Sequence, residues 1–286
     1  MIENNYDSFK DHVKKVAREN NIQPRDVQQL YFMELLVQMI SESKYQHDFI
    51  VKGGCLISNL IGIANRTTND LDFTLKNQSL TVENVTRIFN EITQGHQVKG
   101  FTFKFTGLSP IRKEDIYGGF ELRFEIYFKR IREYLFVDLT TGDTITPSAL
   151  TYDYKCLFNN ETIRILSYTI ETVLAEKFEA ILTKNVLSTR PRDRYDVYIL
   201  FKTNKDKIDM DTLRQAIINT STSRKTTEYF LDYKDLLGSI RESDTQRKQW
   251  TMYQEKFDYA KDITFEQTCD IIEDVLYQIN INEELV

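Results

Sequence analysis

Cysteine, histidine and proline are scarce in this chain of 286 residues, which contains three, three and four of them. Cys55, Cys156 and Cys269 lie far apart without a CxxC pair, so the sequence argues against a zinc site or a disulfide framework. The three histidines show no metal-ligand spacing either. Ten glycines and four prolines are too few for long linkers or extensive disorder, so we expect a compactly folded chain.

Long apolar runs are also missing. The segment 31–40 is interrupted by Glu34 and Gln38 and falls well short of the roughly 20 apolar residues that span a membrane. The opening residues MIENNYDSFK lack the basic start and apolar run of a signal peptide. We therefore expect a cytoplasmic protein without membrane contact, and the sparse, odd set of cysteines fits a reducing compartment.

The charge balance excludes a protein coated with positive charge. The chain has 37 Lys and Arg against 43 Asp and Glu, a net charge of −6. A local basic groove is still compatible with this balance, because a site needs only a few well-placed cations. Apolar residues make up 41% of the chain, and 18 Phe and 16 Tyr supply material for a core. At roughly 150 residues per domain, the length predicts two domains.

Periodicity predicts an α+β fold of the mixed-sheet kind. Apolar residues alternate over 101–105, 120–128 and 133–139, which is typical of half-buried antiparallel strands, and 162–166 is expected to be an edge strand. From about Tyr168 onward the pattern becomes helical, and 224–237 is expected to form one helix. We predict an α+β domain over 1–165, with helices flanking the sheet, and an all-helical domain over 166–286.

The most informative stretch is 52–75. Gly53 and Gly54 open a short apolar helix, and Asp70 and Asp72 follow on a strand. Residues two apart on a strand project from the same face, so the two carboxylates repel each other unless a cation lies between them. Hard cations such as Mg²⁺ prefer oxygen ligands of this type. The stretch predicts a metal site beside a glycine turn that can hold phosphate.

Asp138 lies on a later strand and is a candidate third carboxylate. Three acids from adjacent strands can hold two metal ions, which activate a hydroxyl and stabilise a leaving pyrophosphate. The alternative is that all three are solvated surface charges. A second alternative is the DxDxT pattern of haloacid-dehalogenase-type phosphatases, with Asp70 forming an aspartyl-phosphate. In that family an apolar strand precedes the motif, whereas residues 66–69 here are polar.

The helical half contributes Lys177, which lies in the middle of an apolar helix face and either extends to the surface or reaches nucleotide phosphates. Asp193 and Asp196 are one helical turn apart and face the protein, where they can form a salt bridge with Lys177 or an arginine, or position a nucleotide. A basic cluster at the same helix start is either a solvated loop or a phosphate contact; its arginines are Arg190, Arg192 and Arg194.

Four segments resemble, in chain order over about residues 50–200, the AbiEii/AbiGii-type toxins of the DNA-polymerase-β-like nucleotidyltransferase superfamily. Residues 52–54 and 66–73 are similar to the family's KGG…R-x-[ST]-x-D-[IL]-D segment, and 137–139 with 142–143 resemble its next acidic strand. Glu176-Lys177 resembles its EK segment, and 192–197 resembles the RxxDxxD-type segment that follows.

The resemblance implies a toxin of an abortive-infection, phage-defence type that transfers a nucleoside monophosphate from an NTP with Mg²⁺, or alternatively Mn²⁺. In related toxins the acceptor is the tRNA 3′ end, which stops translation. The cognate antitoxin could act without binding the toxin. The implied roles are metal binding by Asp70, Asp72 and Asp138; nucleotide binding by Gly53, Gly54, Cys55, Lys177, Asp193 and Asp196; catalysis by Asp70, Asp72, Asp138 and Lys177; and RNA or phosphate contacts by Arg66, Arg190, Arg192 and Arg194.

Cys55 departs from the superfamily, which usually has Ser or Thr after the glycines. A thiol is a poorer donor to phosphate than a hydroxyl, so phosphate binding there would rest on backbone N–H groups at the helix start. Two alternatives to the tRNA-directed toxin stay open. One is a nucleotidyltransferase that modifies a protein, a small molecule or itself, and the other is a non-catalytic regulator that binds nucleotide or RNA.

Overall fold

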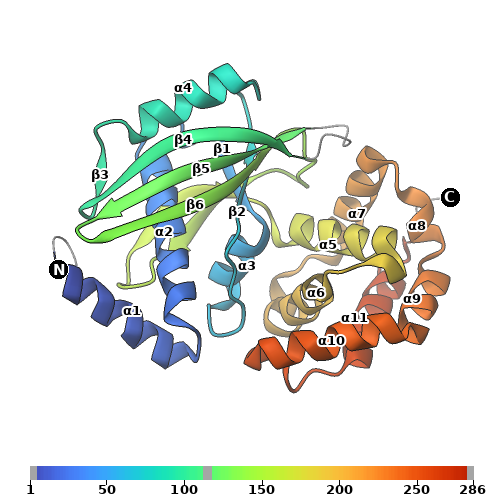
Figure 1. The fold of residues 1–286 in the computed structure, drawn as a ribbon. Helices are drawn as coiled ribbons and strands as arrows, with labels where there is room; N and C mark the ends of the chain where they lie inside the picture. The colour runs from blue at the N-terminus through green and yellow to red at the C-terminus, as the bar shows by residue number, and fades with distance from the viewer. Residues whose placement is uncertain (1–4, 112–117, 282–286) are drawn as a thin grey trace. The chain divides into compact units, whose positions relative to one another are not determined.

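The computed structural model describes residues 5–111 and 118–281 (Figure 1). The chain forms two compact units. The first ends at Asp143 and resumes over Ala149–Tyr168, and the second comprises Thr144–Ser148 and the chain from Thr169 onward. Thr144–Ser148 therefore lies with the helical unit, although the predicted first domain runs through residue 165. No described helix is long and apolar enough to cross a membrane.

The first unit is built on one mixed sheet of eight strands in the order β3-β4-β5-β6-β2-β1-β8-β7. The strands are β1 Phe49–Lys52, β2 Leu71–Leu75, β3 Gln97–Val98, β4 Phe101–Ile111, β5 Gly119–Phe128, β6 Ile131–Thr140, β7 Leu150–Lys155 and β8 Thr162–Ser167. β2 pairs with β6, and β1 with β8, in parallel, and the other pairs are antiparallel. The fold is α+β, as predicted.

The prediction that 162–166 forms an edge strand is wrong. β8 lies between β1 and β7, and β7 forms the edge. The sequence gives little sign of β7, because four of its six residues are exposed and only Tyr152 and Tyr154 are partly or fully buried, so it carries no long apolar stripe. Asp138 is consequently on an internal strand, because β6 lies between β5 and β2.

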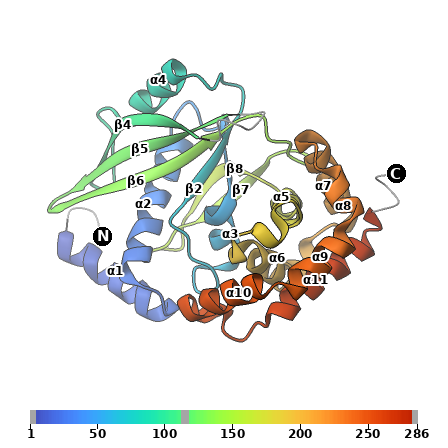
Figure 2. The ribbon, with the colours of Figure 1, turned by 45° about the vertical axis from the view of Figure 1, so that its right-hand side comes forward.

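The described residues of this unit form the helices α1 Tyr6–Asn20, α2 Pro24–Ser41, α3 Gly53–Ile61 and α4 Val82–Thr93. Figures 1 and 2 show α2 passing behind β4, β5 and β6. Its aromatic residues pack with Phe9 of α1 and with Phe101 of β4, whose ring lies 4.1 Å from that of Phe128. This core covers one face of the three strands, so their alternate residues project from the opposite face.

The second unit is helical. Its helices are α5 Ile170–Lys184, α6 Pro191–Asn204, α7 Met210–Arg224, α8 Thr227–Leu231, α9 Tyr233–Glu242, α10 Asp244–Lys256 and α11 Phe265–Gln278, with short 3₁₀ turns at Asn185–Leu187, Lys205–Lys207 and Asp258–Ala260. The single helix predicted over 224–237 is wrong. Lys225 adopts a left-handed conformation (φ 58°) that ends α7, and Asp232 separates α8 from α9.

Candidate active site

The centre of the candidate site is a line of carboxylates across three neighbouring strands. Asp72 of β2 is paired directly with Asp138 of β6, and Asp138 is paired with Glu121 of β5. Paired residues project from the same face, and neighbouring strands lie about 4.8 Å apart. All three side chains are partly buried, and we call Asp72, Asp138 and Glu121 the acid row. Asp70, expected on the same strand as Asp72, precedes β2 by one residue and is exposed.

The structure brings Asp72 and Asp138 together, and it adds Glu121, which the sequence analysis missed. Alternation with the apolar residues of β5 places Glu121 on the polar face of the strand, but only the strand pairing shows that it lies opposite Asp138. The sequence therefore indicates the strand face on which Glu121 lies, but not that Asp138 is its neighbour.

The donor set suits a cation that is shared with a substrate. Among residues 5–111 and 118–281, no group of three or more His, Cys, Asp and Glu side chains could hold a metal ion by itself. Mg²⁺ is commonly bound by one or two carboxylates together with substrate phosphates, rather than by a closed protein cage. The paired carboxylates of Asp72 and Asp138 fit that mode.

Gly53 begins α3 directly against Asp72. Its φ of 63° is left-handed, and a Cβ at this position would lie 2.8 Å from Asp72 Cγ and closer still to one carboxylate oxygen. A Cβ on Gly54 would lie 2.7 Å from Thr68 Oγ1. Both glycines are therefore required by close approach. They place the start of α3, where N–H groups attract anions, beside the acid row.

Internal hydrogen bonds stabilise the turn before Asp70. Ser58 Oγ donates to the Arg66 carbonyl at 2.7 Å, Arg66 donates to the Thr67 carbonyl, and the Asp70 N–H donates to Thr68 Oγ1 at 3.1 Å. Arg66 is only 3% exposed. The side chain is enclosed in the turn that delivers Asp70, and its RNA or phosphate contact stays a prediction.

Cys55 follows the glycines, and its side chain points into the core toward β7. Its side chain is fully buried, and Sγ lies 3.4 Å from the hydroxyl of Tyr154 on β7. Burial raises the pKa of the thiol to about 12, so it stays neutral. The predicted nucleotide contact of Cys55 is therefore limited to its backbone N–H.

A buried ion pair lies next to the acid row. The ammonium of Lys52 is 2.5 Å from Asp143 Oδ2 and donates to Thr140 Oγ1 at 2.7 Å. The same Asp143 oxygen accepts from the hydroxyls of Thr74 and Thr140, and the Lys52 ammonium lies 5.5 Å from the ring centre of Tyr168. Burial alone would raise the pKa of Asp143, but the Lys52 charge and these hydrogen bonds hold it well below its usual range.

The second unit holds a separate charged cluster. Lys177 of α5 lies 2.7 Å from Asp193 and 2.8 Å from Asp196, both on α6. All three residues are buried. Desolvation opposes the charge of Lys177, but the two carboxylates raise its pKa overall, and Lys177 lowers that of Asp193. The two aspartates thus face the protein, as their helical spacing predicts, and their partner there is Lys177. The Lys177 side chain does not extend to the surface.

The three arginines near α6 have different environments. Arg190 lies 2.9 Å from Asp193 Oδ2, and Arg192 is partly buried. Arg194 is 1% exposed, donates to Gln246 Oε1 at 2.8 Å, and lies 5.1 Å from the ring centre of Phe265. The predicted RNA contact of Arg194 is therefore not supported, because its side chain joins α6 to α10 and α11 inside the helical unit.

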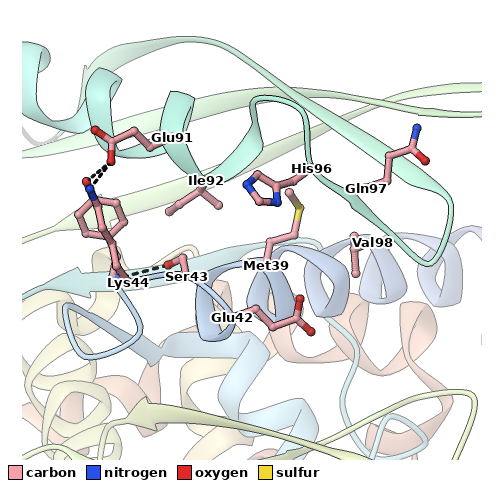
Figure 3. Close-up of a pocket in the computed structure, with 10 residues that line it drawn as sticks. Met39, Glu42, Ser43, Lys44, Glu91, Ile92, His96, Gln97 and Val98 are labelled. Carbon is pink, nitrogen blue, oxygen red and sulfur yellow. Dashed lines mark hydrogen bonds and ion pairs between the residues drawn. The ribbon is translucent and has the colours of Figure 1, made fainter.

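A pocket of about 370 Å³ opens elsewhere on the first unit, between the end of α2, α4 and β3 (Figure 3). Met39, Ile92 and His96 point into it, and Lys44 pairs with Glu91 at its margin at 2.7 Å. None of the residues assigned from the sequence lines this pocket. We therefore place the candidate site at the acid row and α3.

The fold belongs to a known structural class. A candidate nucleotidyltransferase from H. pylori shares 16% identity with a TM-score of 0.51, covering 93% of this chain and 99% of the other. JHP933 from Helicobacter pylori shares 15% identity with a TM-score of 0.50, covering 92% and 94%. A comparison with curated proteins gives no match. These likenesses define a nucleotidyltransferase-like fold.

The sequence itself identifies the family. Residues 34–270 match the family model described as "Nucleotidyl transferase AbiEii toxin, Type IV TA system". The match covers most of the chain and includes the acid row, the glycine turn of α3 and the Lys177 cluster. The chain therefore belongs to the AbiEii family of nucleotidyltransferase toxins of type IV toxin–antitoxin systems, as the resemblance implied.

Proposed function

We propose that the protein transfers a nucleoside monophosphate from an NTP to the 3′-terminal hydroxyl of an RNA, with tRNA as the acceptor, and that this reaction is Mg²⁺-dependent. The observation that carries the proposal is the direct pairing of Asp72 with Asp138 beside Gly53 at the start of α3. This arrangement combines paired carboxylates, which suit a divalent cation, with backbone N–H groups, which suit phosphate.

Each part of the site then has a role. Asp72 and Asp138, with Asp70, would hold Mg²⁺ or Mn²⁺, and the bound ion would neutralise the triphosphate and favour a deprotonated acceptor hydroxyl. Asp138 is also the group proposed to receive the proton of that hydroxyl. The backbone N–H groups of Gly53, Gly54 and Cys55 would donate hydrogen bonds to phosphate oxygens. Glu121 extends the acid row by one strand and would orient Asp138 or the acceptor.

Lys177 is assigned to orienting the nucleotide. Its ammonium already has two aspartate partners, Asp193 and Asp196, which fix its direction. A lysine held in this way is a fixed hydrogen-bond donor, since an ammonium has three donor positions. Arg190 and Arg192 remain candidates for phosphate or RNA contact, because both are partly exposed.

In the cell, we propose a cytoplasmic toxin that stops translation by blocking tRNA 3′ ends and thereby serves phage defence by abortive infection. Family membership supplies the toxin–antitoxin context. The cognate antitoxin would counteract the toxin and need not bind it.

The direct experiment incubates the purified protein with Mg²⁺, each α-labelled NTP in turn, and total tRNA. We expect label on RNA with at least one NTP, and its loss in Asp138→Asn. Asp11→Asn is the matched control, since Asp11 is an exposed carboxylate on α1 of the same unit. Label transfer that persists in Asp138→Asn would eliminate the proposed role of the acid row.

The same experiment separates the alternatives. Label that migrates with protein would indicate a protein acceptor or self-modification. Stabilisation by NTP and Mg²⁺ without any transfer would indicate a non-catalytic nucleotide-binding regulator. Release of inorganic phosphate with a covalent phosphate at Asp70 would indicate the phosphatase alternative.

A further inference from the structure

We propose that the open face of β4, β5 and β6 docks a single-stranded segment of the acceptor RNA and leads its 3′ end to the acid row. This inference rests on the proposed function and names the surface that its acceptor would use. The face lies opposite the side of the sheet that α2 covers (Figure 1). The strand pairing continues this face directly into Asp138 and Glu121.

The outward residues of β6 carry the first part of the evidence. In order along the strand they are Arg132, Tyr134, Phe136 and Asp138. Tyr134 is 50% exposed and Phe136 is 47% exposed, which is unusual for two aromatic rings on one strand face. Residues two apart on a strand are about 7 Å apart, so the rings form a short row that ends at the acid row.

Basic residues on the neighbouring strands surround these rings. Arg123 of β5 is paired with Phe136, and Lys104 of β4 is paired with Glu125, which in turn is paired with Tyr134. Both cations are exposed. Glu125 is already engaged by Arg132, at 3.1 Å, and by the Tyr127 hydroxyl. The face beyond the acid row therefore carries a surplus of positive charge.

The β5–β6 hairpin extends this charge. Lys129 and Arg130 form its turn, and both are exposed. A chain with a net charge of −6 thus gathers five cations on one face and one hairpin: Lys104, Arg123, Lys129, Arg130 and Arg132. Such a local concentration attracts a polyanion regardless of the net charge of the protein.

Exposed aromatic rings on a sheet, surrounded by Arg and Lys, match the chemistry of single-stranded RNA. Unpaired bases stack on aromatic side chains, and the cations contact the phosphates. A duplex cannot use the rings in this way, because its bases are already stacked on one another. A terminal nucleotidyltransferase needs an unpaired 3′ end at its carboxylates, and the row from Arg132 to Asp138 provides a path to them.

The test measures binding without catalysis. A fluorescein-labelled single-stranded RNA of 12 nucleotides is titrated with the full-length protein in the absence of NTP and Mg²⁺, and anisotropy is recorded at several salt concentrations. We expect Phe136→Ala and Tyr134→Ala to weaken binding about 5- to 150-fold each, the range typical of loss of one stacked base. Arg123→Gln should lower affinity and reduce the salt dependence by about one phosphate contact.

Tyr277→Ala provides the matched control, because Tyr277 is a 67% exposed aromatic residue on α11 of the other unit. It should bind RNA as the wild type does. Unfolding midpoints of all variants check the fold, which exposed substitutions should leave unchanged. Equal binding by Phe136→Ala and Tyr277→Ala, or equal affinity for duplex and single strand, would overturn the docking surface.

The outcomes also separate this inference from the proposed function. If the wild type transfers no nucleotide but Phe136→Ala loses RNA binding, the docking surface stands and the enzymatic proposal fails. If the wild type labels RNA and Phe136→Ala keeps full RNA affinity, the enzymatic proposal stands and the docking surface fails. Stabilisation by NTP should be the same in Phe136→Ala and wild type in either case.

Discussion

Lys52 is paired directly with Asp72 across β1 and β2, yet its ammonium lies 2.5 Å from Asp143 Oδ2 and contacts Thr140 and the ring of Tyr168 instead. Lys52, the cation that the strand pairing places beside the acid row, thus forms an ion pair with Asp143. In the proposed metal site, Asp143 would keep a positive charge from competing with a divalent cation at Asp72. The pair also anchors the strand that leads into Gly53.

Replacing Asp143 tests this arrangement. Asp143→Asn should lower the free energy of unfolding by about 3 kcal/mol, because it leaves the Lys52 charge buried without a carboxylate. Affinity for Mn²⁺, read by calorimetry in the presence of a non-hydrolysable NTP, should also fall. The double variant Lys52→Met, Asp143→Asn should regain most of that affinity, since no cation is then released toward Asp72. Persistent weak Mn²⁺ binding in the double variant would contradict this explanation.

Gly53 should be intolerant of any side chain. Gly53→Ala places a methyl group against the Asp72 carboxylate at a left-handed φ, so we expect a stability loss of about 1–2 kcal/mol and loss of nucleotide transfer. Gly238→Ala is the matched control, because nothing lies within 4 Å of a Cβ at that position inside α9. It should be neutral or stabilising by up to about 1 kcal/mol. Urea unfolding and the tRNA labelling assay measure both effects.

Glu34 predicts a pH dependence of stability. It is buried in α2, and burial raises its pKa from 4.5 to about 7, against the opposing effects of the Leu157 N–H and of Lys99. The folded state therefore binds a proton that the unfolded state releases above pH 4.5. This contribution to stability is fully present below pH 4.5 and is lost as pH rises to about 7, by about 3 kcal/mol in total.

Glu34→Gln removes this proton uptake. The free energy of unfolding of the variant should change less than that of the wild type between pH 5 and pH 8, when both are measured in urea at constant ionic strength. The glutamine oxygen can still accept the Leu157 N–H, which donates to Glu34 at 2.6 Å in the wild type. Parallel pH profiles for the two proteins would show that Glu34 is already ionised at pH 5.

Lys177 of α5 pairs with two aspartates of α6, apart from its proposed role in orienting a nucleotide. Lys177→Met leaves Asp193 and Asp196 buried without their shared cation, which should destabilise the protein by about 3–5 kcal/mol. Lys202→Met on the exposed side of α6 should change stability by less than about 0.5 kcal/mol. Activity of Lys177→Met should be compared per folded molecule, at a temperature below its unfolding transition.

The sequence by itself determined the types of most elements, the strand that carries Asp72, the orientation of Asp193 and Asp196 toward the protein, and the family. These features depend on periodicity between near neighbours or on ordered motifs, which a linear sequence carries directly. It did not reveal Glu121, the burial of Arg66 and Arg194, or the direction of the Cys55 thiol.

Only the tertiary structure decided those features, and the reason is physical. Asp72 and Asp138 are 66 residues apart in the chain, and their pairing depends on which strands become neighbours and in what register. Arginine is usually a surface residue, but the turn before β2 encloses Arg66, and the junction of α6 with α10 encloses Arg194. Long-range contacts, rather than local preference, set the partners of Asp72, Asp138 and Arg194.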